Sequence, residues 1–122
     1  MGERTMTDGW VPPKLSQEME LDVAYARSKD GSTRVLPVWF TVNGGKVELL
    51  PMHGLKTKWF IDVERSGSLE LRAKGWKKGA KPNVVRDGEA VEGIKERFAL
   101  KYGREEVKRY YPTSEVALEI QL

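Results

Sequence analysis

The chain has 122 residues, a length that suits one domain with a sizeable hydrophobic core. Its 21 basic and 18 acidic side chains give a formal net charge of +3. The small positive net charge weakly favours anionic ligands. The charges are interleaved along the sequence, which argues against a nucleic-acid-binding face. Cysteine is absent, which excludes disulfides, thiolate metal sites and a cysteine nucleophile.

Several further classes of protein are disfavoured by what the sequence lacks. No apolar run approaches the roughly 18 residues of a membrane span, and the first residues carry no signal-like apolar stretch. We therefore expect a soluble cytoplasmic protein with no membrane partner. His53 is the only histidine, and the carboxylates lack metal-ligand spacing, so no metal is expected. No serine lies in a nucleophile elbow, which leaves the catalytic residues unassigned.

The N-terminal part of the chain predicts an arm followed by a hairpin. Residues 1–13 end in Trp-Val-Pro-Pro and should form an irregular arm, because two prolines neither continue a helix nor donate to a sheet. Residues 14–122 should form a single domain, beginning with a short helical turn over 15–20. Period-two alternation then predicts a strand over 21–26, and an Asp-Gly pair in the following polar turn predicts that the next strand pairs back.

The segment over 33–42 is predicted to be a strand with two apolar faces. One face carries Leu36, Val38, Phe40 and Val42, and the other carries Val35, Pro37 and Trp39. One face can close a core while the other lines a site. Pro37 removes a ladder donor and therefore indicates an edge, a bulge or a place where the sheet gives way to something else. Asn-Gly-Gly over 43–45 then predicts another hairpin, with a strand over 46–52.

The second half of the chain mixes helices with strands. Helical spacing of apolar residues predicts a helix from about residue 55 to the Ser-Gly pair at 66–67, and strict alternation predicts a strand over 68–74. Residues 75–82 are predicted to be a loop or bulged turn before a strand over 83–86. Asp87 should cap a long helix that ends near Gly103. A short helix over 104–110 and a closing strand over 116–122 complete the chain.

These elements indicate a mainly β protein of six strands. One helix is inserted after the third strand, and a helical pair precedes the last. Six hairpin-linked strands are too few for two ordinary stacked sheets, so they should curl into a small closed or split barrel that hides its edges.

Two basic stretches are candidates for binding a phosphate. Arg27, Lys29 and Arg34 flank the first hairpin turn, while Lys56 and Lys58 lie at the start of the first long helix. Helix starts offer free amide groups that favour anions, and Thr57 adds a hydroxyl group. Basic side chains on turns are also commonly just solvated, which is the alternative interpretation.

Large apolar side chains adjoin these basic stretches. Trp39, Phe40, Met52 and Trp59 are suited to bracketing a planar ring, although core packing is the alternative for each of them. His53 is either a donor that faces a ligand or an ordinary loop histidine. A sequence rich in pocket features but poor in acid–base motifs suits a protein whose cofactor carries the chemistry.

Two motifs resemble those of the flavin-binding split-barrel superfamily, which includes pyridoxamine 5′-phosphate oxidases and deazaflavin-dependent nitroreductases. The first is Pro-Val-Trp-Phe at 37–40, and the second is Gly-Leu-Lys-Thr-Lys-Trp at 54–59. The order of elements over 21–122 is also similar. One residue departs from the pattern, since Asp62 stands where the deazaflavin branch usually has asparagine. The resemblance implies a six-stranded antiparallel split β-barrel, and a homodimer with a cofactor at the subunit interface.

The leading hypothesis is therefore an oxidoreductase that binds FMN or a deazaflavin and reduces a small organic acceptor. The alternative is a non-enzymatic split-barrel protein that binds haem through His53, binds another ligand, or has no cofactor. A nucleic-acid-binding barrel is the least favoured hypothesis. The predicted cofactor-binding residues are Arg27, Lys29, Arg34, Pro37, Trp39, Met52, Lys56, Thr57, Lys58 and Trp59.

Overall fold

The computed structural model describes residues 15–113 and 115–122. The predicted arm over 1–13 lies outside the described residues. The strands are β1 (Leu21–Ala26), β2 (Thr33–Val38), β3 (Thr41–Asn43), β4 (Lys46–Leu49), β5 (Leu69–Ala73), β6 (Trp76–Ala80), β7 (Asn83–Val85) and β8 (Ala117–Gln121). The helices are α1 (Lys58–Ser66), α2 (Gly88–Tyr102) and α3 (Arg104–Tyr110), with single 3₁₀ turns η1 (Leu15–Gln17) and η2 (Gly54–Lys56).

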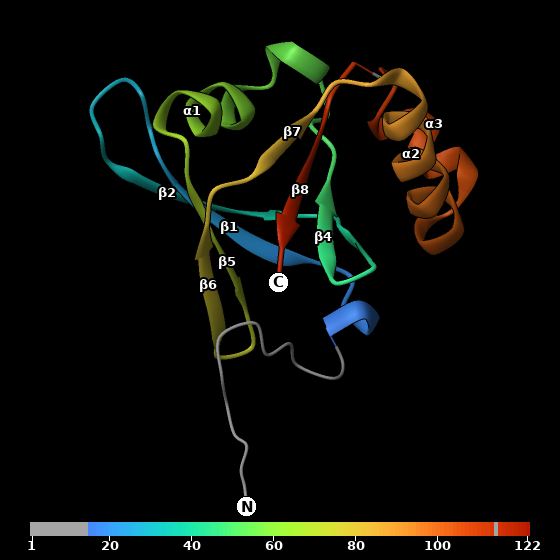
Figure 1. The fold of residues 1–122 in the computed structure, drawn as a ribbon, viewed down its shortest axis with the longest axis horizontal. Helices are drawn as coiled ribbons and strands as arrows, with labels where there is room; N and C mark the ends of the chain where they lie inside the picture. The colour runs from blue at the N-terminus through green and yellow to red at the C-terminus, as the bar shows by residue number, and fades with distance from the viewer. Residues whose placement is uncertain (1–14, 114) are drawn as a thin grey trace, which may run out of the picture.

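The strands form two four-stranded antiparallel sheets. One sheet has the order β2-β1-β5-β6, and the other has the order β3-β4-β8-β7. The chain passes from the first sheet to the second twice, at residues 39–40 between β2 and β3 and at residues 81–82 between β6 and β7. In Figure 1 the two sheets cross, with β8 and β4 standing in front of β1. The mainly β architecture with three helices agrees with the prediction.

The predicted count of six strands is not confirmed, because the described residues contain eight. The expected strand over 33–42 is broken into β2 and β3, and these two strands belong to different sheets. The expected loop over 75–82 contains β6, which pairs with β5 along its whole length. This strand escaped prediction because it lies at a sheet edge and carries Lys77, Lys78 and Gly79 in place of alternating apolar residues.

The core has two parts. Between the sheets, fully buried side chains from both sheets and from α1 pack together, among them Phe40, Leu49, Phe60, Leu71 and Ile120. The other part joins α2 and α3 to the second sheet through Val91, Ile94, Phe98, Val107 and Ala117. Figure 1 shows α2 and α3 side by side at the flank of β4. No helix within the described ranges is long and apolar enough to cross a membrane.

A buried ion pair fastens α2 to the second sheet. Glu48 of β4 is only 1% exposed, and Arg97 of α2 donates to both of its carboxylate oxygens, from Nε at 2.8 Å and from a terminal nitrogen at 2.5 Å. The Thr41 hydroxyl donates to the same carboxylate at 2.6 Å. The hydrogen bonds to Glu48 raise the pKa of Arg97, so the guanidinium stays charged at neutral pH. The pair therefore joins α2 to β4.

The turn before α1 depends on a glycine. Gly54 is buried with φ of +59°, and a Cβ there would clash with the Glu115 carboxylate and lie 2.7 Å from Thr113 Oγ1. Glu115 accepts a hydrogen bond from the Leu55 amide at 3.2 Å, and it would have to give this up to make room. The glycine thus allows the C-terminal segment to hold the start of η2.

Replacing Gly54 with alanine should therefore cost more than the same change at Gly44. Gly44 has a similar φ of +58° but open space around its α-carbon. Gly44→Ala should lose about 1 kcal/mol from the left-handed backbone alone. Gly54→Ala should lose about 1 kcal/mol more, because a hydrogen bond is also broken. Urea denaturation of both variants measures the difference, and equal losses would contradict the proposed role of Glu115.

Candidate functional site

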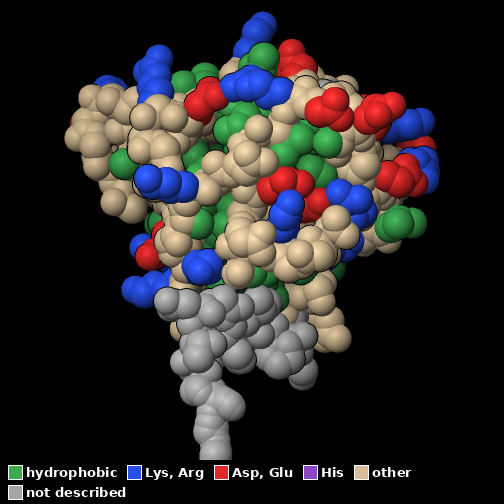
Figure 2. Space-filling view, in the orientation of Figure 1, with side chains coloured by type: hydrophobic (Ala, Val, Ile, Leu, Met, Phe, Trp, Pro, Cys, Tyr) green, Lys and Arg blue, Asp and Glu red, His purple; other side chains and the backbone are tan. Residues whose placement is uncertain are grey.

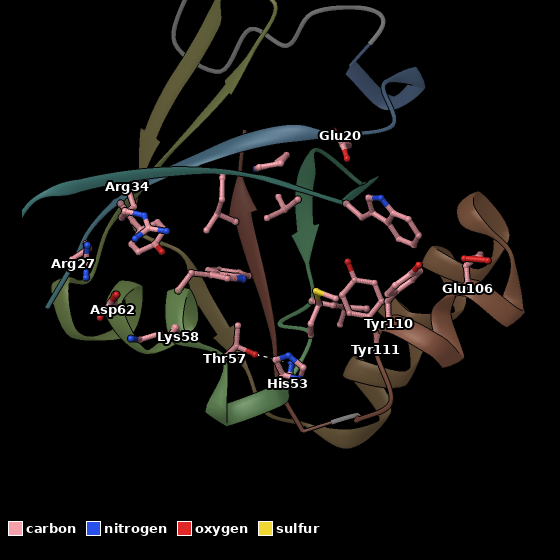
Figure 3. A pocket seen from close by; sticks show the side chains of 18 residues that line it. Glu20, Arg27, Arg34, His53, Thr57, Lys58, Asp62, Glu106, Tyr110 and Tyr111 are labelled. Atoms are coloured by element: carbon pink, nitrogen blue, oxygen red, sulfur yellow. Dashed lines mark hydrogen bonds between the residues drawn. The ribbon is translucent and has the colours of Figure 1, made fainter. Parts of the chain in front are cut away.

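A pocket of about 580 Å³ opens between β2, the segment from residue 50 to α1, and α3. Figure 3 shows β2 along one side, η2 and α1 on the opposite side, and α3 at one end. The pocket is within the size range of small-molecule and cofactor sites, and it is lined by both apolar and charged side chains. Its two ends differ in chemistry.

One end of the pocket is charged. Arg27 follows β1, Arg34 lies on β2, and Lys58 and Asp62 lie on α1. In Figure 3 these four side chains gather at the same end of the pocket. Three cations and one carboxylate leave this end with an excess of positive charge, which favours an anion.

The start of α1 adds to this positive character. Thr57 is the N-cap residue, but its hydroxyl makes no capping hydrogen bond to the helix and instead accepts one from the His53 amide at 2.8 Å. The first turn of α1 carries no acidic residue. The positive end of the helix dipole is therefore not compensated by an acidic side chain in its first turn.

Asp62 connects the β1–β2 turn to α1 at the charged end of the pocket. Its carboxylate accepts a hydrogen bond from the Ser28 amide at 3.2 Å, which joins the β1–β2 turn to α1. Hydrogen bonding from Ser28, helped by the charges of Lys58 and Arg27, lowers the pKa of Asp62. Its carboxylate therefore stays ionised at neutral pH and reduces the positive charge available to a bound anion.

The other end of the pocket is aromatic. Trp39 contacts the ring of Tyr110 edge-on, with centroids 5.5 Å apart, and the ring of Tyr111 at 6.0 Å. Burial raises the pKa of Tyr111, so its hydroxyl remains protonated. Trp59 is buried on α1 and also lines the pocket, as does the exposed Met52. This end presents ring faces and edges suited to an aromatic ligand.

The structure brings together most of the residues predicted to bind a cofactor. Those that line the pocket are Arg27, Arg34, Pro37, Trp39, Met52, Thr57, Lys58 and Trp59. Lys29 and Lys56 do not line it: Lys29 is exposed at the β1–β2 turn, and Lys56 is exposed at the end of η2. Phe40 is fully buried in the core, which matches its alternative interpretation. Binding of a cofactor by the lining residues stays a prediction.

Several lining residues were not foreseen from the sequence. Tyr25, Glu106, Tyr110 and Tyr111 all border the pocket. Tyr25 shares a strand face with the core residues Leu21 and Val23, so its position in the sequence indicated core packing. Burial raises the pKa of Tyr25. The adjacent aromatic side chains of Tyr110 and Tyr111 at the end of α3 were the one available signal. Only the fold reveals that α3 reaches the end of β2.

The sequence has no match among protein-family models and none among curated proteins. Solved structures do resemble it. A conserved hypothetical protein from Mycobacterium tuberculosis superposes with a TM-score of 0.74 at 13% identity, covering 98% of this chain and 84% of the other. An F420-H2-dependent reductase gives 0.66 at 14% identity, covering 84% and 94%. HutZ, the haem storage protein from Vibrio cholerae, gives 0.67 at 16% identity, covering 87% and 83%.

These likenesses show the fold. At identities of 13–16%, the superpositions show a shared fold and no more, and that fold is in line with the split-barrel architecture that the sequence resemblance implies. The resemblance predicted from the two sequence motifs is thereby confirmed at the level of the fold. Since the similar structures include both a reductase and a haem storage protein, the fold by itself assigns no ligand.

Proposed function

We propose that the pocket binds a flavin-type cofactor, FMN or a deazaflavin, and that the protein is an oxidoreductase that reduces a small organic acceptor. The observation that carries this proposal is the polarity of the pocket. Arg34 and Lys58 line one end, while Trp39 and Tyr110 line the other. A molecule with an anionic tail and a flat aromatic ring matches both ends at once.

Each group of residues has a physical role in this proposal. Arg27, Arg34 and Lys58 would hold the phosphate by charge-assisted hydrogen bonds, each worth about 1.5–3 kcal/mol. Trp39 and Met52 would pack against the ring, and the buried Trp59 would keep water from it. The cofactor, when bound, supplies the hydride-transfer chemistry. The protein side then needs to bind, orient and shield the ring.

A homodimer with the pocket at its interface is part of the proposal. β2 is an edge strand of its sheet, and it exposes the apolar side chain of Val35 at 45% and that of Pro37. The same strand forms a wall of the pocket. A second copy packed on β2 would bury these residues and narrow the pocket. Light scattering during gel filtration tests this arrangement, and a monomer at micromolar concentration would contradict it.

Equilibrium titration tests the cofactor directly. Purified protein should quench the fluorescence of FMN or of a deazaflavin with a dissociation constant in about the micromolar range, as two or three charge-assisted contacts would give. Reduced cofactor should then pass electrons to a quinone or nitroaromatic acceptor faster with protein than without it. No binding of either cofactor at saturating protein would overturn the proposal.

Replacing Asp62 with asparagine should strengthen FMN binding, whereas the other substitutions in the pocket should weaken it. Asp62→Asn keeps an oxygen that accepts from the Ser28 amide but removes a negative charge beside Lys58 and Arg27. FMN affinity should therefore rise by about threefold to tenfold at neutral pH, because one repulsive carboxylate is lost. Riboflavin, which lacks the phosphate, should bind the variant and the wild type equally. Unchanged FMN affinity would place the phosphate elsewhere.

A haem-binding protein is the second candidate function, favoured by the position of His53. This residue lines the pocket, and it is the one histidine in the sequence. Haem titration of the purified protein, followed by its Soret band, separates the two candidates. A Soret shift in wild-type protein that His53→Ala abolishes would favour haem storage over flavin chemistry.

A further inference from the structure

Tyr102, at the C-terminal end of α2, does not line the pocket but holds one of its walls. Its ring is stacked on that of Trp39, with centroids 4.2 Å apart and planes within 6° of parallel. Trp39 in turn lines the aromatic end of the pocket and contacts Tyr110 edge-on. One face of the Trp39 indole is thus covered by Tyr102, a residue outside the pocket. The position of the indole in the pocket wall therefore depends on Tyr102.

The hydroxyl of Tyr102 is anchored at the break between β2 and β3. It accepts a hydrogen bond from the Phe40 amide at 3.0 Å, and it lies 2.8 Å from the Met19 carbonyl, to which it donates. The Phe40 carbonyl, 3.0 Å from the same hydroxyl, accepts from the Lys101 ammonium group at 2.9 Å. The end of α2 therefore satisfies backbone groups that the strand ladder leaves free at this break.

The Tyr102 hydroxyl keeps its protonation state near neutral pH. Burial raises the pKa of Tyr102 to about 12, so its hydroxyl remains both donor and acceptor. Burial lowers the pKa of Lys101, whose ammonium group lies 3.8 Å from the centroid of the Phe40 ring. The other charged groups that act on this pair are Glu20, on Tyr102, and Glu18, on Lys101.

We infer that Tyr102 is a positioning residue that fixes Trp39 as the ring-binding wall of the pocket and thereby sets the affinity for the aromatic part of the ligand. This inference rests on the proposed function, because it assigns the ring to the aromatic end. The stack and the hydroxyl have separable roles. The stack orients the indole, whereas the hydroxyl stabilises the strand break.

Two substitutions separate these roles. Tyr102→Phe keeps the stack and loses the hydroxyl, so the free energy of unfolding should fall by about 1–3 kcal/mol for the unpaired Phe40 amide. Its affinity for riboflavin should stay within about twofold of wild type. Tyr102→Leu loses the stack as well, and it should weaken riboflavin and FMN by the same factor of about fivefold. Lys58→Ala, by contrast, should weaken FMN alone.

The pattern across ligands identifies a positioning role. A purely structural role predicts that affinity follows stability. Tyr102→Phe and Tyr102→Leu would then each weaken binding in proportion to the fall in their urea midpoints. Affinity that follows stability in this way would overturn the inference. So would a Tyr102→Leu variant that binds riboflavin as tightly as wild type.

A ligand-free readout distinguishes failure of this inference from failure of the proposed function. Protein labelled with 5-fluorotryptophan gives a ¹⁹F resonance for Trp39, assigned with Trp39→Phe. In Tyr102→Leu this resonance should lose its ring-current shift, while those of Trp59 and Trp76 stay in place. The dye 1-anilinonaphthalene-8-sulfonate, an aromatic anionic probe, should also bind Tyr102→Leu about fivefold more weakly. If flavins fail to bind but this dye responds as expected, only the flavin assignment falls; an unchanged dye affinity overturns the inference.

Discussion

Lys58→Ala should weaken FMN binding at least about tenfold, whereas Lys56→Ala should leave it within about twofold. The two lysines are two residues apart and both exposed, but only Lys58 lines the pocket, near Arg34 and Asp62. Loss of a charge-assisted hydrogen bond at this end costs about 1.5–3 kcal/mol. Fluorescence titration of FMN with each variant, at fixed ionic strength, measures the difference.

Lys56→Ala is a matched control because it removes the same charge from the same surface. Its result therefore reports long-range electrostatics, and the excess loss in Lys58→Ala reports direct contact. A second matched pair comes from the first hairpin, where Arg34 lines the pocket and Lys29 does not. Equal losses at Lys56 and Lys58 would show that the phosphate is not held where we propose.

Arg97→Ala should destabilise the protein by about 3 kcal/mol, at the lower end of the range for breaking a buried ion pair because the arginine side chain is 35% exposed. The variant leaves the Glu48 carboxylate buried, with the Thr41 hydroxyl as its remaining hydrogen-bond donor among the described residues. Urea denaturation followed by circular dichroism gives the change in the free energy of unfolding.

A double variant tests the cause of that loss. Glu48→Gln combined with Arg97→Met removes both charges and keeps an amide that can accept from Thr41. It should recover at least about half of the stability lost in Arg97→Ala, because the main cost is an unpaired buried charge and not the missing attraction. If the double variant is less stable than Arg97→Ala, the attraction itself dominates.

Local sequence signals predicted most elements of the fold. The Asp30-Gly31 and Asn43-Gly44-Gly45 turns both join paired strands, as their backbone preferences require. Asp87 caps α2 by accepting a hydrogen bond from the Ala90 amide at 3.0 Å, as predicted. These features depend on residues close in sequence, so a single sequence contains the information.

The position of the break between β2 and β3 could not be predicted from local sequence signals. Pro37 indicated an edge, a bulge or a place where the sheet gives way to something else. The break itself falls at residues 39–40, where the partner groups come from Tyr102 and Lys101, about 60 residues later. A strand pattern over 33–42 cannot reveal this, because its alternation continues through the break. Long-range tertiary hydrogen bonds override the local preference for an uninterrupted strand.

The candidate site was predictable in kind but not in detail. Basic residues around a turn and a helix start indicated an anion-binding end, and the fold brings Arg27, Arg34 and Lys58 to one pocket. Which residue of each cluster points inward depends on the register of β2 and the first turn of α1. The aromatic end needed α3, whose Tyr110 reaches the pocket only through the packing of the C-terminal helices.

A crystal structure of the protein grown with saturating FMN tests the central claim most directly. We expect density for the phosphate within hydrogen-bonding distance of Arg34 and Lys58, and density for the ring against Trp39, with a second copy of the chain packed on β2. Density for the cofactor outside this pocket, or a ring placed at the charged end, would contradict the account.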